Sequence, residues 1–148
     1  MIAFLRHGLP LLVWMLIIFG ASADAQSTAH TSRFLEPFLR WLNPDISAAA
    51  IDAVRWLVRK AAHMGEYAVL AWLGWRALRR PVRYDPRPWS WPIAGAAWAL
   101  TLLYAASDEF HQTFVANRTG SLVDVGIDAM GGAIGLGLLR LWYGWRRR

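Results

Sequence analysis

The residues most suited to chemistry lie between positions 103 and 128, in a stretch flanked by two strongly apolar segments. This stretch carries carboxylates, an imidazole, an amide, a guanidinium and a hydroxyl: Asp108, Glu109, His111, Gln112, Arg118, Ser121, Asp124 and Asp128. A charged group next to hydrocarbon is costly unless it is paired or hydrated, so such a cluster indicates a functional site. The alternative is a solvated polar loop between two membrane helices.

A second polar group lies earlier in the chain, at the start of another apolar segment. Its members are spaced three or four residues apart: Lys60, His63, Glu66 and Tyr67. Side chains at this spacing share one face of a helix. We therefore expect a polar face at one end of this helix. The same one-turn spacing would relate Asp124 to Asp128 if the helix there continues through both.

Binding of a polar ligand is the first function that these residues suggest. Lys60 and Arg118 would pair with a phosphate or a carboxylate, while Gln112 and Ser121 would bond amides or hydroxyls. Most of the other residues are acidic or imidazole groups, which suit sugars or peptides better than a bare phosphate. The residues alone therefore indicate a polar ligand, such as a headgroup at the membrane surface.

Acid–base catalysis is the second hypothesis, and the sequence does not decide whether the chain is an enzyme. A carboxylate that orients an imidazole is the required arrangement, and His63 with Glu66, or His111 with Asp108 or Glu109, would supply it. No nucleophile elbow surrounds a serine or threonine. The histidine and carboxylate spacing matches no established zinc signature, so we expect no metal and no cofactor.

A purely structural role is the third hypothesis. His63, Glu66 and Gln112 would then cap and cross-link helix ends by hydrogen bonds, as polar residues often do in bundles. A proton path is hard to draw, because nothing polar continues through residues 68–78 or 132–139.

The composition places these residues in a membrane protein. The chain has 148 residues, which fits one domain over 1–148, and it is 56% hydrophobic with 10 Trp and only 18% charged residues. Its formal charge of +6 comes mostly from arginines beside apolar runs. That distribution favours lipid headgroups as partners and argues against nucleic acid. With no Cys, disulfides and thiolate sites are excluded.

Four apolar segments are candidates for membrane spans, and they lead us to predict an all-α, four-helix transmembrane bundle. They cover residues 9–23, 61–78, 89–106 and 123–143. The first also resembles a secretory signal peptide, because Ala21-Ser22-Ala23 looks like a small-residue cleavage site; we favour a retained helix. In the last, Gly131 and Gly135 form a small-residue face that suits packing within the molecule.

The loop 24–60 carries two amphipathic pieces, at 34–42 and 51–58. Both have apolar residues at helical spacing and basic or acidic residues on the other faces. Short helices in the headgroup region and a soluble cap over the bundle fit this pattern equally well.

The expected topology brings the polar groups together at one face. Four spans put both termini on the same side as the arginine-rich segment 79–87, which is the cytoplasmic side by the positive-inside rule. Arg55, Arg59 and Lys60, at the outer end of the second span, run against that rule. The loops 24–60 and 107–122 would lie outside the cytoplasm, with the polar groups around an outward-facing pocket.

These motifs together resemble the VanZ-like family of small bacterial membrane proteins. The matching elements are Arg59-Lys60-Ala61-Ala62-His63-Met64-Gly65-Glu66-Tyr67, Ser107-Asp108-Glu109-Phe110-His111-Gln112, Arg118-Thr119-Gly120-Ser121, Asp124, Asp128 and Gly131-Gly132. The resemblance implies a four-helix fold, residence in the cell membrane and a role in the cell envelope. The founding member is associated with resistance to the lipoglycopeptide teicoplanin. The resemblance therefore implies a protein that binds or remodels an envelope ligand, which would be a lipid headgroup, a cell-wall precursor or a lipoglycopeptide. Asp128 stands where many members carry Asn, which adds an acidic group to the site.

Overall fold

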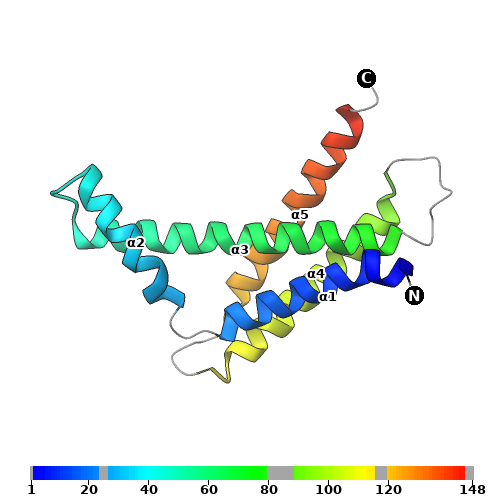
Figure 1. Cartoon of the computed structure of the whole chain (residues 1–148), viewed down its shortest axis with the longest axis horizontal. Coiled ribbons are helices and arrows are strands. Elements are labelled where there is room, and N and C mark those ends of the chain that lie inside the picture. The colour runs from blue at the N-terminus through cyan, green and yellow to red at the C-terminus, as the bar shows by residue number, and fades with distance from the viewer. Residues whose placement is uncertain (1, 24–26, 80–88, 116–119, 146–148) are drawn as a thin grey trace.

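The computed structural model describes residues 2–23, 27–79, 89–115 and 120–145, and all regular structure in these ranges is helical (Figure 1). The helices are α1 (Ile2–Ala23), α2 (Ser27–Leu42), α3 (Ala48–Arg79), α4 (Trp91–Gln112) and α5 (Leu122–Trp145). The predicted all-α class is confirmed. Of the residues singled out in the sequence, Arg118 lies outside the described residues, as do Arg80, Arg83, Arg87 and the three C-terminal arginines.

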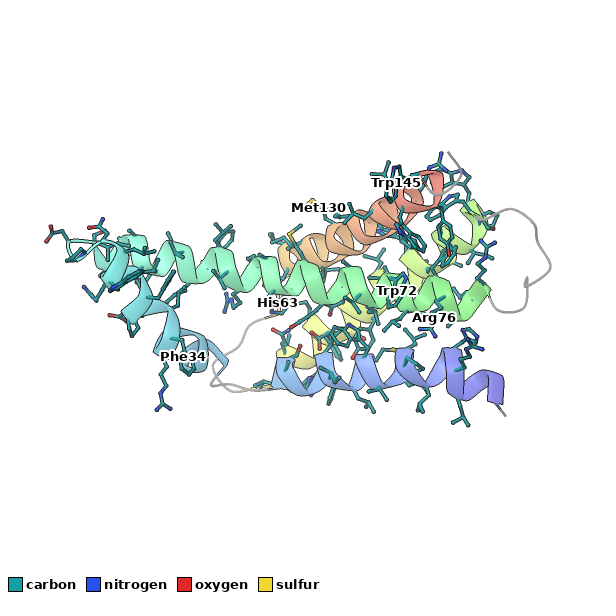
Figure 2. The ribbon with its side chains drawn as sticks, turned by 45° about the horizontal axis from the view of Figure 1, so that its top comes forward. Phe34, His63, Trp72, Arg76, Met130 and Trp145 are labelled. Carbon is teal, nitrogen blue, oxygen red and sulfur yellow. The ribbon has the colours of Figure 1, made fainter. Side chains whose placement is uncertain are left out.

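The long helix α3 is the centre of the molecule, and it packs against α5, α4 and α1. α4 also packs against α5 and α1. α2 contacts the N-terminal part of α3, and these two segments project beyond the other helices (Figures 1 and 2). Phe34 of α2 therefore lies far from Arg76 and Trp145, with His63 between them along the molecule (Figure 2).

The helix ends fall into two groups, as the alternating topology predicts. The start of α1, the end of α3, the start of α4 and the end of α5 lie at one end of the molecule (Figures 1 and 2). The end of α1, the end of α4 and the start of α5 lie together at the other end, beside the middle of α3. The polar residues of three helices are thereby gathered at this second end.

The second predicted span, 61–78, is only part of a longer helix. The amphipathic piece 51–58 is continuous with the following apolar segment, so α3 runs unbroken for 32 residues. No proline occurs between Pro44 and Pro81, and the helix starts with three alanines, which have the highest helix propensity. The first amphipathic piece, at 34–42, does form part of a separate helix, α2.

The helix that carries the third predicted span, 89–106, also extends beyond it. α4 continues to Gln112, so the first six residues of the expected loop 107–122 are helical. Asp108, Glu109 and Gln112 are buried there, and their polar atoms bond other side chains. Because partners from neighbouring helices replace water, the polar residues do not end the helix.

The first helix begins before residue 9 and contains a proline whose cost is partly offset. Pro10 has no N–H to donate to the carbonyl four residues earlier, which belongs to Arg6. Arg76 Nη2 of α3 donates a hydrogen bond to that carbonyl at 3.2 Å. The contact fastens the start of α1 to the end of α3.

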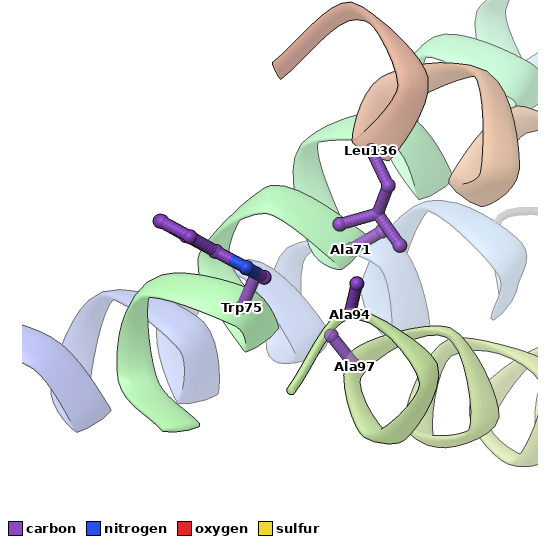
Figure 3. Packing of buried hydrophobic residues seen from close by; sticks show 5 residues of the cluster. All are labelled: Ala71, Trp75, Ala94, Ala97 and Leu136. Atoms are coloured by element: carbon purple, nitrogen blue, oxygen red, sulfur yellow. The ribbon is translucent and has the colours of Figure 1, made fainter. Parts of the chain in front are cut away.

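The apolar core away from the polar residues consists mainly of small side chains around one tryptophan. Ala71 and Trp75 of α3 pack with Ala94 and Ala97 of α4 and Leu136 of α5 (Figure 3). Small residues let the three helices approach closely, which is a common way of packing helices in membranes.

The glycine-rich face of α5 packs inside the molecule, as predicted. A Cβ added at Gly131 would overlap the backbone of Met64, and one added at Gly135 would lie 2.7 Å from the carbonyl oxygen of Ala68. A Cβ at Gly132 would lie 2.9 Å from Thr101 Cγ2 of α4. α5 is thus seated against α3 and α4 one turn beyond Asp128.

Two helical segments among the described residues are long and apolar enough to cross a membrane, by length and composition: Leu5–Ser22 and Leu122–Trp145. The helices α3 and α4, which carry most of the polar residues discussed above, do not meet this criterion.

Candidate functional site

Asp108 is the residue at which three helices meet. Its Oδ2 accepts hydrogen bonds from Ser22 Oγ of α1 at 2.6 Å, from Gln112 Nε2 of α4 at 3.2 Å and from Tyr67 Oη of α3 at 3.4 Å. The side chain is only 2% exposed. A buried carboxylate requires such donors, so Asp108 ties the ends of α1 and α4 to the middle of α3.

Glu109 connects the end of α4 to the start of α5. Its Oε1 accepts a hydrogen bond from Gln112 Nε2 at 3.3 Å, and its Oε2 accepts one from the backbone N–H of Ser121 at 2.8 Å. Gly120 allows this approach, because a Cβ there would lie 2.5 Å from the Glu109 carbonyl oxygen. Burial raises the pKa of Glu109, and the Ser121 hydrogen bond opposes that shift.

Lys60 and Asp124 form an ion pair between α3 and α5. Lys60 is 9% exposed, and its Nζ lies 5.8 Å from the centre of the Trp56 ring. The Asp124 side chain is 30% exposed. The pair therefore lies at the edge of the group of polar residues that we call the polar cluster, which comprises Lys60, His63, Tyr67, Asp108, Glu109, His111, Gln112, Asp124 and Asp128.

His63 of α3 faces Asp128 of α5. The distance from His63 Nδ1 to Asp128 Oδ1 is 3.8 Å, which is an electrostatic contact and too long for a hydrogen bond. The His63 side chain is 23% exposed, whereas Asp128 is 1% exposed. Asp128 Oδ2 has no hydrogen-bond partner among the described residues, and the same is true of Asp108 Oδ1.

His111 turns toward α1. Its ring lies 4.2 Å from that of Phe19, centre to centre, at an interplanar angle of 33°. Its Nδ1 is buried and has no hydrogen-bond partner within the part of the chain that the structure describes. His111 Nδ1 therefore makes no hydrogen bond to Asp108 or Glu109, the carboxylates that the sequence suggested as its partners.

The sequence profile of the family described as VanZ/LLP1 matches residues 8–143. The chain belongs to the VanZ/LLP1 family. The match covers most of α1, all of α2, α3 and α4, and almost all of α5, so it spans the polar cluster and the helices that position it. No curated protein and no solved structure matches the chain.

Most of the predicted site residues of this VanZ/LLP1 chain are brought together. They form two groups. Hydrogen bonds connect the first group, which consists of Asp108, Tyr67, Gln112, Glu109 and Ser121. The second group consists of two charge pairs between α3 and α5, Lys60 with Asp124 and His63 with Asp128. The partner of His63 is Asp128 of α5.

Glu66 contacts α1 through its backbone. Its backbone carbonyl accepts a hydrogen bond from Trp14 Nε1 of α1 at 2.9 Å. Its side chain is partly exposed and interacts electrostatically with Asp108. His63 and Glu66 share a helix face in the VanZ/LLP1 chain, but the His63 side chain contacts Asp128 of α5.

The sequence did not predict that α1 contributes residues to the site. Ser22, Trp14 and Phe19 all contact site residues of other helices. One signal was present, because Ser22 is a hydroxyl residue that follows an apolar run from Gly8 to Ala21, where it would need a polar partner.

The described residues contain no group of three or more His, Asp or Glu side chains that could hold a metal ion. The cluster offers hydrogen-bond acceptors, one ammonium and two imidazoles. These groups can form hydrogen bonds and charge pairs.

Proposed function

We propose that this chain is a multi-pass protein of the cell membrane, and that it binds a polar ligand of the cell envelope at the cluster formed by α3, α4 and α5. Large apolar side chains are exposed along the helices, which supports residence in a bilayer. Leu16 of α1, Leu103 of α4 and Leu141 of α5 are each 69–70% exposed. Exposed apolar surface of this extent is unusual in a water-soluble monomer.

The distribution of charge supports cytoplasmic termini. Arg6, Arg76 and Arg140 belong to the helix ends away from the cluster, where Arg140 also lies 4.9 Å from the centre of the Trp91 ring. Basic residues and tryptophans at one end of a bundle are typical of the cytoplasmic membrane interface. At the other end, Arg55 pairs with Glu36 and Asp52, and Lys60 pairs with Asp124, so much of the opposing positive charge is neutralised.

The observation that carries the proposed binding function is a set of buried polar atoms without partners. Within the polar cluster, and counting partners among the described residues only, these are Asp108 Oδ1, Asp128 Oδ2 and His111 Nδ1. Leaving such groups without hydrogen bonds is costly, so they favour a role in holding a ligand. The partly exposed His63 and Asp124 beside Asp128 give the ligand a polar approach from the surface.

The expected ligand is a lipid headgroup, a cell-wall precursor or a lipoglycopeptide. Carboxylates and imidazoles accept hydrogen bonds from hydroxyl, amide and amino groups, which all these molecules carry. A membrane site would keep the acyl chain of the ligand in the bilayer while its polar part reaches the cluster.

Binding to the purified protein in lipid nanodiscs tests this function, with teicoplanin and a lipid-linked cell-wall precursor as probes. Asp128→Asn and Asp124→Asn should insert normally but bind at least one probe roughly tenfold more weakly than the wild type, because each loses a charged acceptor. Asp52→Asn, on the exposed projecting part of α3, is the matched control and should bind normally. Wild-type affinity in both site variants, or no binding of either probe by the wild type, would reject the proposal.

An acid–base enzyme is the second candidate function, and the juxtaposition of His63 and Asp128 favours it. A carboxylate beside an imidazole can orient it and stabilise its charged form during proton transfer. Mass spectrometry of lipid and peptidoglycan fractions incubated with the protein should then reveal a product that His63→Gln no longer makes. Product formation that is unchanged in His63→Gln would exclude His63 as the acid or base.

A further inference from the structure

Ser22 occupies the last turn of α1, yet it is a buried partner of the polar cluster. Its side chain is 3% exposed, and its hydroxyl donates the shortest of the three hydrogen bonds that Asp108 Oδ2 accepts, at 2.6 Å. The bond joins residues 86 positions apart in the chain. A hydroxyl that bonds a carboxylate in a buried place forms a strong, charge-assisted hydrogen bond.

The rest of α1 fixes the place of Ser22. Trp14 Nε1 donates to the carbonyl oxygen of Glu66 at 2.9 Å, and the hydroxyl of Tyr104 donates to the carbonyl oxygen of Met15. Ile18 is 1% exposed and packs in a core cluster with side chains of α3 and α4: Tyr67, Leu70 and Ala105. These contacts set both the rotation and the height of α1, so Ser22 arrives at Asp108 with its hydroxyl directed at Oδ2.

We propose that Ser22 is a positioning residue of the polar site and that α1 is therefore a permanent part of the working protein. The inference rests on the proposed binding function, because it assigns Ser22 the task of holding Asp108 in place for that function. Without Ser22, Asp108 Oδ2 would retain only the longer bonds from Gln112 and Tyr67. The carboxylate would then be free to turn and would present Oδ1 in a different direction.

The same geometry bears on the cleavage motif in α1. Ala21-Ser22-Ala23 has the small residues of a signal-peptidase site, but the structure holds it as the end of a helix with Ser22 buried. Proteases act on exposed, flexible backbone. Cleavage after Ala23 would also separate the Ser22 hydroxyl from the chain that carries Asp108.

Intact-mass spectrometry of the protein purified from membranes tests the retention of α1. The expected mass includes residues preceding Asp24. A purified protein whose N-terminus is Asp24 or Gln26 would overturn the inference.

Infrared spectroscopy tests the positioning role directly. The Asp108 carboxylate band, assigned by difference from Asp108→Asn, should shift in Ser22→Ala and return toward the wild-type position in Ser22→Thr, which restores a hydroxyl. Ser107→Ala is the matched control, because the Ser107 hydroxyl bonds the carbonyl oxygen of Tyr104 in its own helix and is exposed. An Asp108 band in Ser22→Ala that coincides with the wild-type band would overturn the inference.

Binding measurements separate this inference from the proposed function. Teicoplanin or precursor affinity should fall roughly tenfold in Ser22→Ala, as expected for loss of one charge-assisted hydrogen bond, and recover in Ser22→Thr. If the wild type binds neither probe while the band shift and the intact α1 are observed, the binding function fails and the positioning of Asp108 by Ser22 stands. If the wild type binds and Ser22→Ala binds equally well with an unshifted band, the inference alone fails.

Discussion

At the scale of single residues, the polar cluster has a satisfied part, whose carboxylate oxygens accept hydrogen bonds, and an unsatisfied part, whose carboxylate oxygens accept none from the described residues. Asp108 Oδ2 and both oxygens of Glu109 have hydrogen-bond donors from other residues. Asp128 has an imidazole at 3.8 Å and no hydrogen bond to its Oδ2 among the described residues. The satisfied part holds helices together, whereas the unsatisfied part is where we expect a ligand to bind.

Asp108→Ala tests the structural importance of the satisfied part. The substitution removes the acceptor of three buried donors, so we expect the free energy of unfolding in detergent to fall by about 3 kcal/mol. Asp52→Ala removes an exposed carboxylate that pairs with Arg55 and should change stability by less than about 1 kcal/mol. Equal stability of the two variants would contradict the role of Asp108 as the joint between helices.

The sequence identified the members of the cluster better than it identified their partners. Helical spacing placed His63 and Tyr67 on one face, and the structure confirms that both contact acidic residues of other helices. Spacing along one helix cannot reveal which neighbour crosses that face, so the partnership of His63 with Asp128 was not predicted. Ser22 was missed for the same reason, because its acceptor lies 86 residues away.

At the scale of helices, the position of α5 depends on two glycines that face α3. A Cβ at Gly131 would overlap the Met64 backbone, and a Cβ at Gly135 would lie 2.8 Å from the Cα of Ala68. Gly137, in the same helix, has nothing within 4 Å of an added Cβ. Gly131 and Gly137 therefore form a matched pair for comparison, because both lie in α5 and only Gly131 has a close neighbour.

Gly131→Ala should lower the free energy of unfolding by about 1–3 kcal/mol, because α5 must move away from α3 to admit the methyl group. Gly137→Ala should leave stability unchanged or raise it by up to about 1 kcal/mol, since alanine favours a helix. Thermal or denaturant unfolding in detergent would measure both. A neutral Gly131→Ala would mean that α5 does not approach α3 as closely as the structure indicates.

The existence and order of the helices followed from the sequence, but two of their boundaries did not. The apolar pattern changes from amphipathic to continuous near Lys60, and this change suggested a break that α3 does not have. At the end of α4, polar residues suggested a loop, yet Asp108 finds a partner in Ser22 of α1, and Gln112 bonds Asp108 and Glu109 of its own helix. A tertiary contact that local patterns do not reveal thus supports the end of α4, whereas α3 continues because nothing in its sequence breaks the helix.

At the scale of the whole molecule, the arrangement has a polar end and a basic, tryptophan-rich end. The cluster lies where α1 and α4 finish and α5 begins, and the α2–α3 projection extends beyond that end (Figure 1). The opposite end carries cation–aromatic contacts, such as that of Arg79 with Trp75 at 5.0 Å. This polarity predicts a single orientation across the membrane, with the cluster facing outward.

Single-cysteine labelling tests that orientation, and the absence of native cysteines makes the wild type a clean control. Asp45→Cys, in the exposed turn between α2 and α3, and Phe114→Cys, just after α4, should react with a membrane-impermeant maleimide on intact spheroplasts. Gly144→Cys, near the end of α5, should react only after the membrane is permeabilised, because it belongs to the opposite end of the bundle. If positions 45 and 114 report opposite sides of the membrane, the polar residues of α3 and α4 cannot form one outward-facing site, and the proposed binding function would be rejected.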